Sequence, residues 1–298
     1  MEMGSAAKMR RAVEAAVNTR AYGKMAREML EVMKRIDLST VALLSARPVD
    51  RILVVLISSN RGLCGSYNSN VFKKTRLHLR QHLRELSRQP VLTETEEETK
   101  AVSGEVGVDI IGIGKKSAEF ARREGHPLLA VFDEFSERPR FEEVLPVIRM
   151  VIDSFLKNSH QKVFISYTDY KSSLLQEANL VQLLPVHVRD IKDLLDRAEA
   201  LAPTEAMESK IEIDEYLFEP GMSEVVESSL RRLVEVGLYQ TILESAASEH
   251  SSRMLAMRNA SEAAADMIHD LEVTFNKARQ AAITQEISEI VGGAAALA

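Results

Sequence analysis

Residues 223–232 read Ser-Glu-Val-Val-Glu-Ser-Ser-Leu-Arg-Arg, residues 283–291 read Ile-Thr-Gln-Glu-Ile-Ser-Glu-Ile-Val, and no proline stands between them. The only interior glycine of the stretch is Gly237. This pattern predicts one continuous helix over residues 223–291. At 1.5 Å rise per residue such a helix runs about 100 Å, several times the diameter of a small domain. The helix must therefore project from its domain or pair with a partner helix.

The apolar positions in the middle of this helix repeat at alternating spacings of three and four residues. That spacing is typical of the seam of a coiled coil. Alanine dominates the seam, so two helix axes can approach closely and the coiled coil is slender. A long core helix of an all-helical bundle is the alternative that the seam alone leaves open. The seam positions are Met257, Ala260, Ala264, Met267, Leu271, Thr274, Ala278 and Ala281.

A second long helix is predicted over residues 1–36, where proline is absent and apolar or small residues again have coiled-coil spacing. Basic residues outnumber acidic ones in this helix, whereas the helix over residues 223–291 is acidic. Opposite charges favour an antiparallel pair, although exposed ion pairs add only about 0.2–1 kcal/mol each. Because the first helix is the shorter one, the tip beyond about Ala281 is expected to stand unpaired.

Between the two helices, strand patterns alternate with helix patterns. Residues 51–57 form an unbroken apolar run after Arg51, which is typical of a strand buried on both faces of a parallel sheet. A glycine-containing loop and a helical pattern follow, as in the opening of a βαβ unit. We therefore predict a Rossmann-like α/β domain over residues 48–219, flanked by coiled-coil helices over residues 1–47 and 220–298. The expected strands are residues 51–57, 108–113, 128–132, 163–167, 180–184 (pairing with 163–167) and 210–218, and the expected helices are residues 68–86, 115–123 and 141–156.

Composition excludes several classes of protein. The chain has 298 residues, a formal net charge of -6 and a pI near 5.8, and it lacks basic tracts, which argues against nucleic acid as a partner. No run approaches the roughly 20 apolar residues of a membrane span. The single cysteine cannot form an internal disulfide, so we expect a soluble protein of a reducing compartment.

The glycine loop invites an enzymatic interpretation, because a strand, a glycine-rich turn and a helix N-terminus can cradle a phosphate. However, Gly62 and Gly65 do not complete a dinucleotide-binding motif, and no Gly-Lys-Ser/Thr sequence is present. Cys64 has no base placed beside it, and His78 with His82 lacks further metal ligands. The residues therefore favour a mechanical or interaction protein without cofactor, metal or active site.

Several motifs resemble one family. They are Ser5-Ala-Ala-Lys-Met-Arg-Arg11, Arg61-Gly-Leu-Cys-Gly65 with Asn68, Asn70 and Phe72, Tyr216-Leu-Phe-Glu-Pro220, Leu243-Glu-Ser-Ala-Ala-Ser-Glu-His-Ser-Ser-Arg-Met-Leu-Ala-Met257, and Asn276-Lys-Ala-Arg-Gln-Ala-Ala-Ile-Thr-Gln-Glu-Ile-Ser-Glu-Ile-Val-Gly-Gly-Ala294. Together they closely resemble the gamma subunit of F-type ATP synthases, in the family's order and across nearly the whole chain.

This resemblance implies a function. Gamma subunits are central rotors, in which an antiparallel coiled coil turns inside a ring of three alpha and three beta subunits. The α/β domain lies outside the ring and holds the epsilon subunit and the c-subunit ring. Proton flow turns the shaft, which drives the catalytic sites of the ring in sequence. The implied protein is not an enzyme by itself, and it lies on the cytoplasmic face of a bacterial inner membrane through its complex.

The resemblance also implies site residues. Arg253, Gln280 and Thr284, with Glu286 nearby, are similar to family positions that touch loops of the beta subunits, and Met1 and Lys8 face acidic loops of beta. The turn made by Arg61, Gly62, Leu63, Cys64 and Gly65 is a candidate contact on the epsilon and c-ring side. Family members begin further upstream, so Met1 corresponds to an internal methionine of the N-terminal helix. The alternatives are a coiled-coil scaffold or adaptor, and a nucleotide-binding Rossmann-like enzyme.

Overall fold

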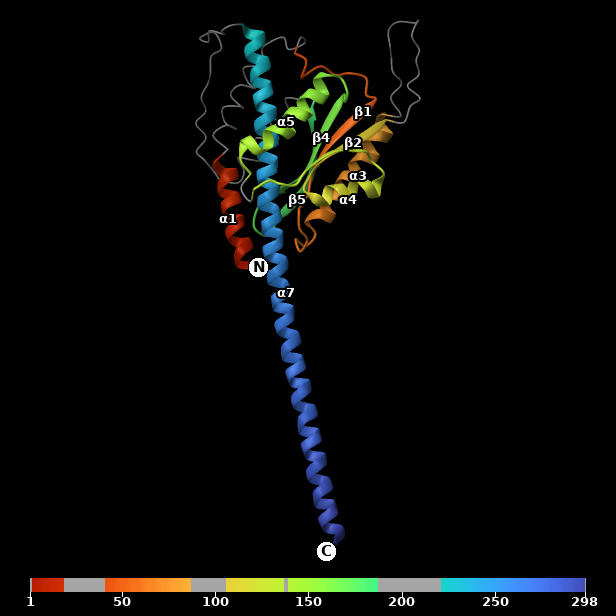
Figure 1. Cartoon of the computed structure of the whole chain (residues 1–298), viewed down its shortest axis with the longest axis vertical. Helices are drawn as coiled ribbons and strands as arrows, with labels where there is room; N and C mark the ends of the chain where they lie inside the picture. Colours follow the sequence, from red (N-terminus) through yellow and green to blue (C-terminus); the bar gives the residue numbers. More distant parts are fainter. Residues whose placement is uncertain (1, 19–40, 87–105, 137–138, 187–220, 298) are drawn as a thin grey trace.

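A computed structural model describes residues 2–18, 41–86, 106–136, 139–186 and 221–297. These residues form an α/β domain with one helix that runs through the domain and far beyond it (Figure 1). Some predictions lie outside the described residues. They are residues 19–36 of the first helix, the strand over residues 210–218, and the position of Met1.

The domain is built on a five-stranded sheet with the order β3-β2-β1-β4-β5. Strands β1 to β4 are parallel, and β5 pairs antiparallel with β4, which confirms the predicted pairing of residues 180–184 with residues 163–167. The sequence pattern located every one of these strands, although β4 and β5 are longer than expected. The strands are β1 (Arg51–Ile57), β2 (Gly107–Ile113), β3 (Leu128–Phe132), β4 (Lys162–Tyr170) and β5 (Gln176–Leu184).

Helices cover both faces of the sheet, so successive residues of the central strand β1 are buried on opposite sides. Ile52, Val54 and Leu56 pack with α3 (Tyr67–Leu86) and α4 (Lys115–Glu124). Leu53, Val55 and Ile57 pack with α5 (Phe141–Leu156) and with the first part of α7 (Met222–Leu297). This burial on both faces explains the unbroken apolar run that predicted a parallel sheet.

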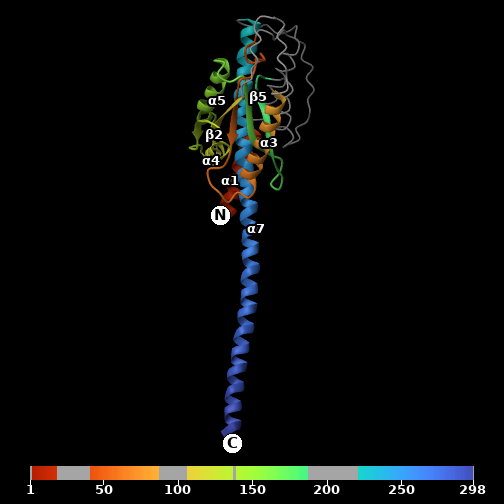
Figure 2. The same cartoon turned by 90° about the vertical axis from the view of Figure 1, so that its right-hand side faces the viewer.

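Helix α7 is 76 residues long, and its two parts have different surroundings. The first part contributes side chains to the main core of the domain, including Leu230, Val234, Leu238 and Ile242. From Arg258 onward every described side chain of α7 is exposed. Figure 2 shows this part continuing as a single helix beyond the domain. The same helix is thus a core element of the domain and a projecting rod.

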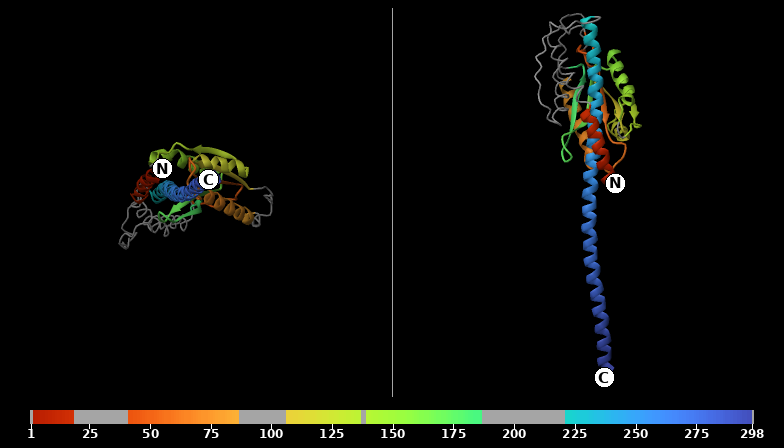
Figure 3. Two further views of the ribbon diagram at one scale, coloured as in Figure 1. Left: turned by 90° about the horizontal axis from the view of Figure 1, so that it is seen from below. Right: turned by 90° about the vertical axis from the view of Figure 1, so that its left-hand side faces the viewer.

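Helix α1 (Glu2–Asn18) lies antiparallel beside α7, but only beside the part that is inside the domain (Figure 3). Ala12 packs with Ala247, and Ala15 packs with Leu243. The predicted pairing of the seam down to about Ala281 is therefore wrong for the described residues. Helix α1 begins near the level at which α7 leaves the domain and runs back along the domain, so it never reaches the seam. Leu271, in the middle of that seam, is 69% exposed.

A substitution at Gly114 tests how closely β1 and β2 approach at the start of α4. Gly114 has φ +87°, and a Cβ there would overlap the carbonyl oxygen of Ser58. We expect Gly114→Ala to lower the free energy of unfolding by about 1–3 kcal/mol, because a side chain is strained at this φ and backbone must move. Urea unfolding followed by circular dichroism measures the change. Gly292→Ala is the matched control, since a Cβ at Gly292 meets no neighbour; equal effects of the two variants would contradict the prediction.

Candidate functional site

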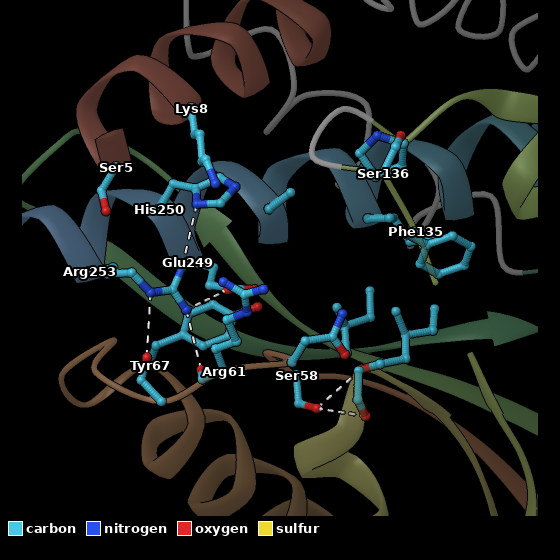
Figure 4. Close-up of a pocket in the computed structure, with 18 of the residues that line it drawn as sticks. Ser5, Lys8, Ser58, Arg61, Tyr67, Phe135, Ser136, Glu249, His250 and Arg253 are labelled. Carbon is cyan, nitrogen blue, oxygen red and sulfur yellow. Dashed lines mark hydrogen bonds and ion pairs between the residues drawn. The ribbon is translucent and has the colours of Figure 1, made fainter. Parts of the chain in front are cut away.

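The candidate site lies at the carboxyl ends of β1, β2 and β3, the edge at which open α/β sheets usually bind their ligands. Here two helices cover that edge. Residues 242–253 of α7 and residues 4–8 of α1 border the same space as the loops that follow the strands (Figure 4). We call the part of α7 from Gln240 to Arg253, with the segments that contact it, the neck.

Arg253 ties α7 to the turn at residues 61–65. Its Nε donates to the carbonyl oxygen of Gly62 at 3.4 Å, and its Nη2 donates to the carbonyl oxygen of Arg61 at 3.3 Å. Nη2 also lies 2.7 Å from Oε1 of Glu249, one helical turn earlier, and the Arg253 side chain is only 14% exposed. The structure thus brings together two groups of predicted site residues that are distant in the sequence.

The first turn of α3 holds the turn at residues 61–65 in place through the side chain of Asn68. Asn68 donates from Nδ2 to the Sγ of Cys64 at 3.3 Å and to the Oγ of Ser59 at 2.7 Å. Leu63 has φ +61° and is exposed, whereas Cys64 is buried. Gly65 faces α7 at Ala256. The turn therefore presents one apolar side chain to solvent at the end of the domain from which α7 projects.

Small polar side chains join α7 to β4. The backbone N–H of Thr168 donates to Ser245 Oγ at 3.1 Å, and Ser248 Oγ donates to the Thr168 carbonyl at 3.2 Å. One turn further, Ser251 Oγ donates to the Ser173 carbonyl at 2.7 Å. These directional bonds fix α7 both along its axis and around it, which an apolar contact alone does not do. These serines were not among the predicted site residues, although their spacing of three residues places them along one side of the long helix.

Burial shifts two titratable groups of the neck. It raises the pKa of the Tyr67 hydroxyl far above its ordinary value, and the charge of Glu249 adds to the effect. Burial also raises the pKa of Glu249, against the opposing influence of the Arg253 and Lys8 charges. The carboxyl group of Glu249 is thus partly desolvated, and it lies in the electrostatic field of two cations, Arg253 and Lys8.

The other predicted site residues lie apart from the neck or at its border. Lys8 lines the space between α1 and α7. Gln280, Thr284 and Glu286 are exposed on the projecting part of α7, about 40 Å or more from Arg253 at 1.5 Å per residue. The predicted contacts therefore form two groups, one at the neck and one on the rod.

The glycine loop and the start of α4 offer little to a phosphate. In the loop the N–H of Ser59 donates to Asn68 Oδ1 at 3.0 Å, and that of Tyr67 donates to the Cys64 carbonyl at 3.2 Å. The N–H of Lys115 donates to Asn60 Oδ1 at 3.0 Å, that of Lys116 to the Ser59 carbonyl at 3.2 Å, and that of Ser117 to the Gly114 carbonyl at 3.2 Å. The first N–H groups of α4, which would bind an anion in a nucleotide site, are thus already used within the protein. Among the described residues no cluster of side chains suits a metal ion. None of the described helices is long and apolar enough to cross a membrane.

Comparisons with known proteins agree on one family. A family model described as ATP synthase matches residues 1–297. The chain is 34% identical to the ATP synthase gamma chain of Dehalococcoides mccartyi (strain 195) and 37% identical to that of Chloroflexus aurantiacus (strain J-10-fl). Both alignments include the whole of this chain, and they cover 92% and 91% of the relatives.

Solved structures with the same fold come from mitochondrial ATP synthases. The central stalk and c-ring structure from Tetrahymena thermophila contains a chain with a TM-score of 0.55 and 21% identity, with 88% of this chain and 97% of that chain covered. A chain of the Euglena gracilis enzyme gives a TM-score of 0.51 at 16% identity, with 99% and 92% covered. At these identities the likeness concerns the fold.

The raised pKa of Glu249 predicts a pH dependence of stability. The folded protein binds this proton more tightly than the unfolded chain, so the stabilisation is complete below the ordinary value of 4.5. It is lost as the pH rises through the raised pKa. We expect the free energy of unfolding, measured in urea relative to Glu249→Gln, to fall as the pH rises above 4.5 and through the raised pKa of Glu249.

Glu262→Gln is the matched control for this experiment, because the ion pair of Glu262 with Arg258 is exposed on the rod and contributes little. A difference between the Glu249→Gln variant and the parent that stays constant, or that grows with pH, would contradict the assignment.

Proposed function

The chain belongs to the ATP synthase family, as a gamma chain, and we propose that its two structural parts divide the work of the rotor between them. It is the rotor shaft of a rotary ATP synthase, a subunit that has no catalytic activity of its own. The domain receives the torque of the membrane part, and the rod of α7 delivers it to the catalytic ring. Rotation in the opposite direction carries the free energy of ATP hydrolysis back to the membrane.

The observation that carries this proposal is the exposed apolar surface of the rod. A soluble protein rarely leaves a long series of large apolar side chains in water unless a partner covers it. Inside a ring of alpha and beta subunits the series is enclosed, which removes the cost of its exposure. The exposed side chains are Met267, Ile268, Leu271, Phe275, Ile283, Ile287, Ile290 and Val291.

The neck supports the same role, because a shaft must not slip in the body that turns it. Ser245, Ser248 and Ser251 bond to the backbone of β4 or of the turn after it, and Arg253 bonds to the turn at residues 61–65. These contacts come from both sides of α7. Torque applied to the domain therefore passes into α7 through directional bonds before the helix enters the ring.

For the contacts with other subunits we propose two zones. Gln280, Thr284 and Glu286 lie on the rod and would meet loops of the beta subunits inside the ring. Arg253, Lys8 and Met1 would meet beta loops at the entrance of the ring.

The turn at residues 61–65 lies at the end of the domain from which the rod projects (Figure 1). We therefore propose that it faces the catalytic ring, rather than the epsilon and c-ring side that the resemblance suggested. The opposite end of the domain, where α7 begins, is then the end for the epsilon subunit and the c-subunit ring. Through that ring the chain is held at the cytoplasmic face of a bacterial inner membrane, and proton flow turns it.

Reconstitution tests the function. The isolated chain should hydrolyse no ATP, whereas its addition to alpha and beta subunits of a bacterial relative should produce steady hydrolysis and unidirectional rotation of a bead attached to the domain. A scaffold or adaptor protein would fail to assemble with these subunits, and a Rossmann-like enzyme would bind nucleotide by itself. Either result would overturn the rotor assignment.

Cysteine labelling tests the position of the rod. The native Cys64 is buried, so an introduced cysteine is expected to react first. Thr284→Cys should react with a maleimide in the isolated chain and become protected, by about tenfold or more in rate, when alpha and beta subunits are added. Met150→Cys on α5 is the control and should stay reactive in both states. Equal reactivity of Thr284→Cys before and after assembly would place the rod outside the ring.

A further inference from the structure

A cavity of about 550 Å³ lies in the neck, between the sheet edge, α7 and the start of α1 (Figure 4). Its size is that of small-molecule sites, which usually measure about 300–1,000 Å³. Its position is the carboxyl edge of the parallel strands, where open α/β folds hold ligands. Nothing in the rotor function requires a hollow at this place.

The wall of the cavity on the side of the sheet is apolar. Ile57 and Ile113 border it at the ends of β1 and β2, and Phe132 borders it at the end of β3. Phe135 adds a second ring nearly parallel to Phe132, with 6.5 Å between the ring centroids and 8° between the planes. A flat apolar body would lie well against such a wall.

The opposite side of the cavity is basic. Lys8 comes from α1, Arg61 from the turn after β1, and Arg253 from α7, whereas Glu249 is the only acidic residue among the described residues of the lining. Glu249 forms an ion pair with Arg253, with 2.7 Å between Oε1 and Nη2, so its negative charge is matched within the lining. His250 completes this side. The balance of charge therefore attracts an anion, although the N–H groups of α4 are not available for a phosphate cradle.

We propose that the neck cavity is a binding site for a small organic anion with a flat apolar body and one carboxylate or sulfonate group. The body lies against Phe132 and Phe135, and the acid group meets Lys8 and Arg61. Because α1, α7 and the turn after β1 all border the cavity, a bound anion joins these three segments. Binding therefore stiffens the neck and stabilises the folded chain.

The test uses two probes with the same ring and opposite charge, 2-naphthoate and 2-naphthylmethylammonium, with the full chain in titration calorimetry. We expect one saturable site for naphthoate and binding of the cation weaker by about tenfold or more. Lys8→Gln and Arg61→Gln should each weaken naphthoate binding by about fivefold. A saturating concentration of naphthoate should also raise the unfolding midpoint of the parent.

Matched variants separate the cavity from the exposed rod. Ala246→Phe places a ring in the cavity from α7 and should abolish naphthoate binding, whereas Leu271→Ala alters only the apolar surface of the rod and should leave binding unchanged. Circular dichroism checks that each variant is folded. If Ala246→Phe is unfolded, the proposal is tested by Lys8→Gln and Arg61→Gln instead. Absence of saturable binding, equal binding of the two probes, or loss of binding in Leu271→Ala would overturn the proposal.

Discussion

The hydrogen bonds between α7 and β4 are the constraint on which the rest of the structure depends. Ser245 and Ser248 approach the backbone of Thr168 closely because they are small, and they bond to it directly. A purely apolar contact at this place would resist separation but would permit sliding and rotation of the helix. The polar contact costs desolvation of several groups, and it gives α7 one position relative to the sheet. Every other element, from α1 to the turn at residues 61–65, is placed relative to that fixed helix.

The fixed helix also explains why a sheet of Rossmann-like order lacks a nucleotide site. The edge that would hold the nucleotide is covered by α7 and α1. The amide oxygen of Asn68 accepts from the N–H of Ser59 in the glycine loop, and that of Asn60 accepts from the N–H of Lys115 at the start of α4. The glycines serve the backbone instead. Gly114 lets β2 turn into α4 against the carbonyl group of Ser58, and Gly65 supplies a positive φ of +56° in the turn beside α7. At this edge of the sheet the packing of α7 thus takes the place of a nucleotide site.

Much of this arrangement could be predicted from the sequence, because local periodicity reports local structure. The apolar run at residues 51–57 indicated a doubly buried strand, and the proline-free stretch from Ser223 indicated the long helix. Relations between distant segments were harder. The pattern of α1 showed that it needs a partner but not that this partner is the buried part of α7, since Ala12 and Ala15 fit equally well against any small-residue seam. The serine contacts were missed because a buried serine and a solvated one look the same in a sequence.

The change of surroundings at Arg258 has a mechanical consequence. Before this residue α7 is fastened on several sides, so twisting it would require many bonds to break together. Beyond it the isolated chain has a single helix of about 60 Å, whose twist is resisted only by its own backbone. Elastic compliance is therefore concentrated in the projecting length, and the domain behaves as a rigid handle. A torque between the two ends of α7 is therefore taken up as torsion of the projecting length rather than as movement within the domain.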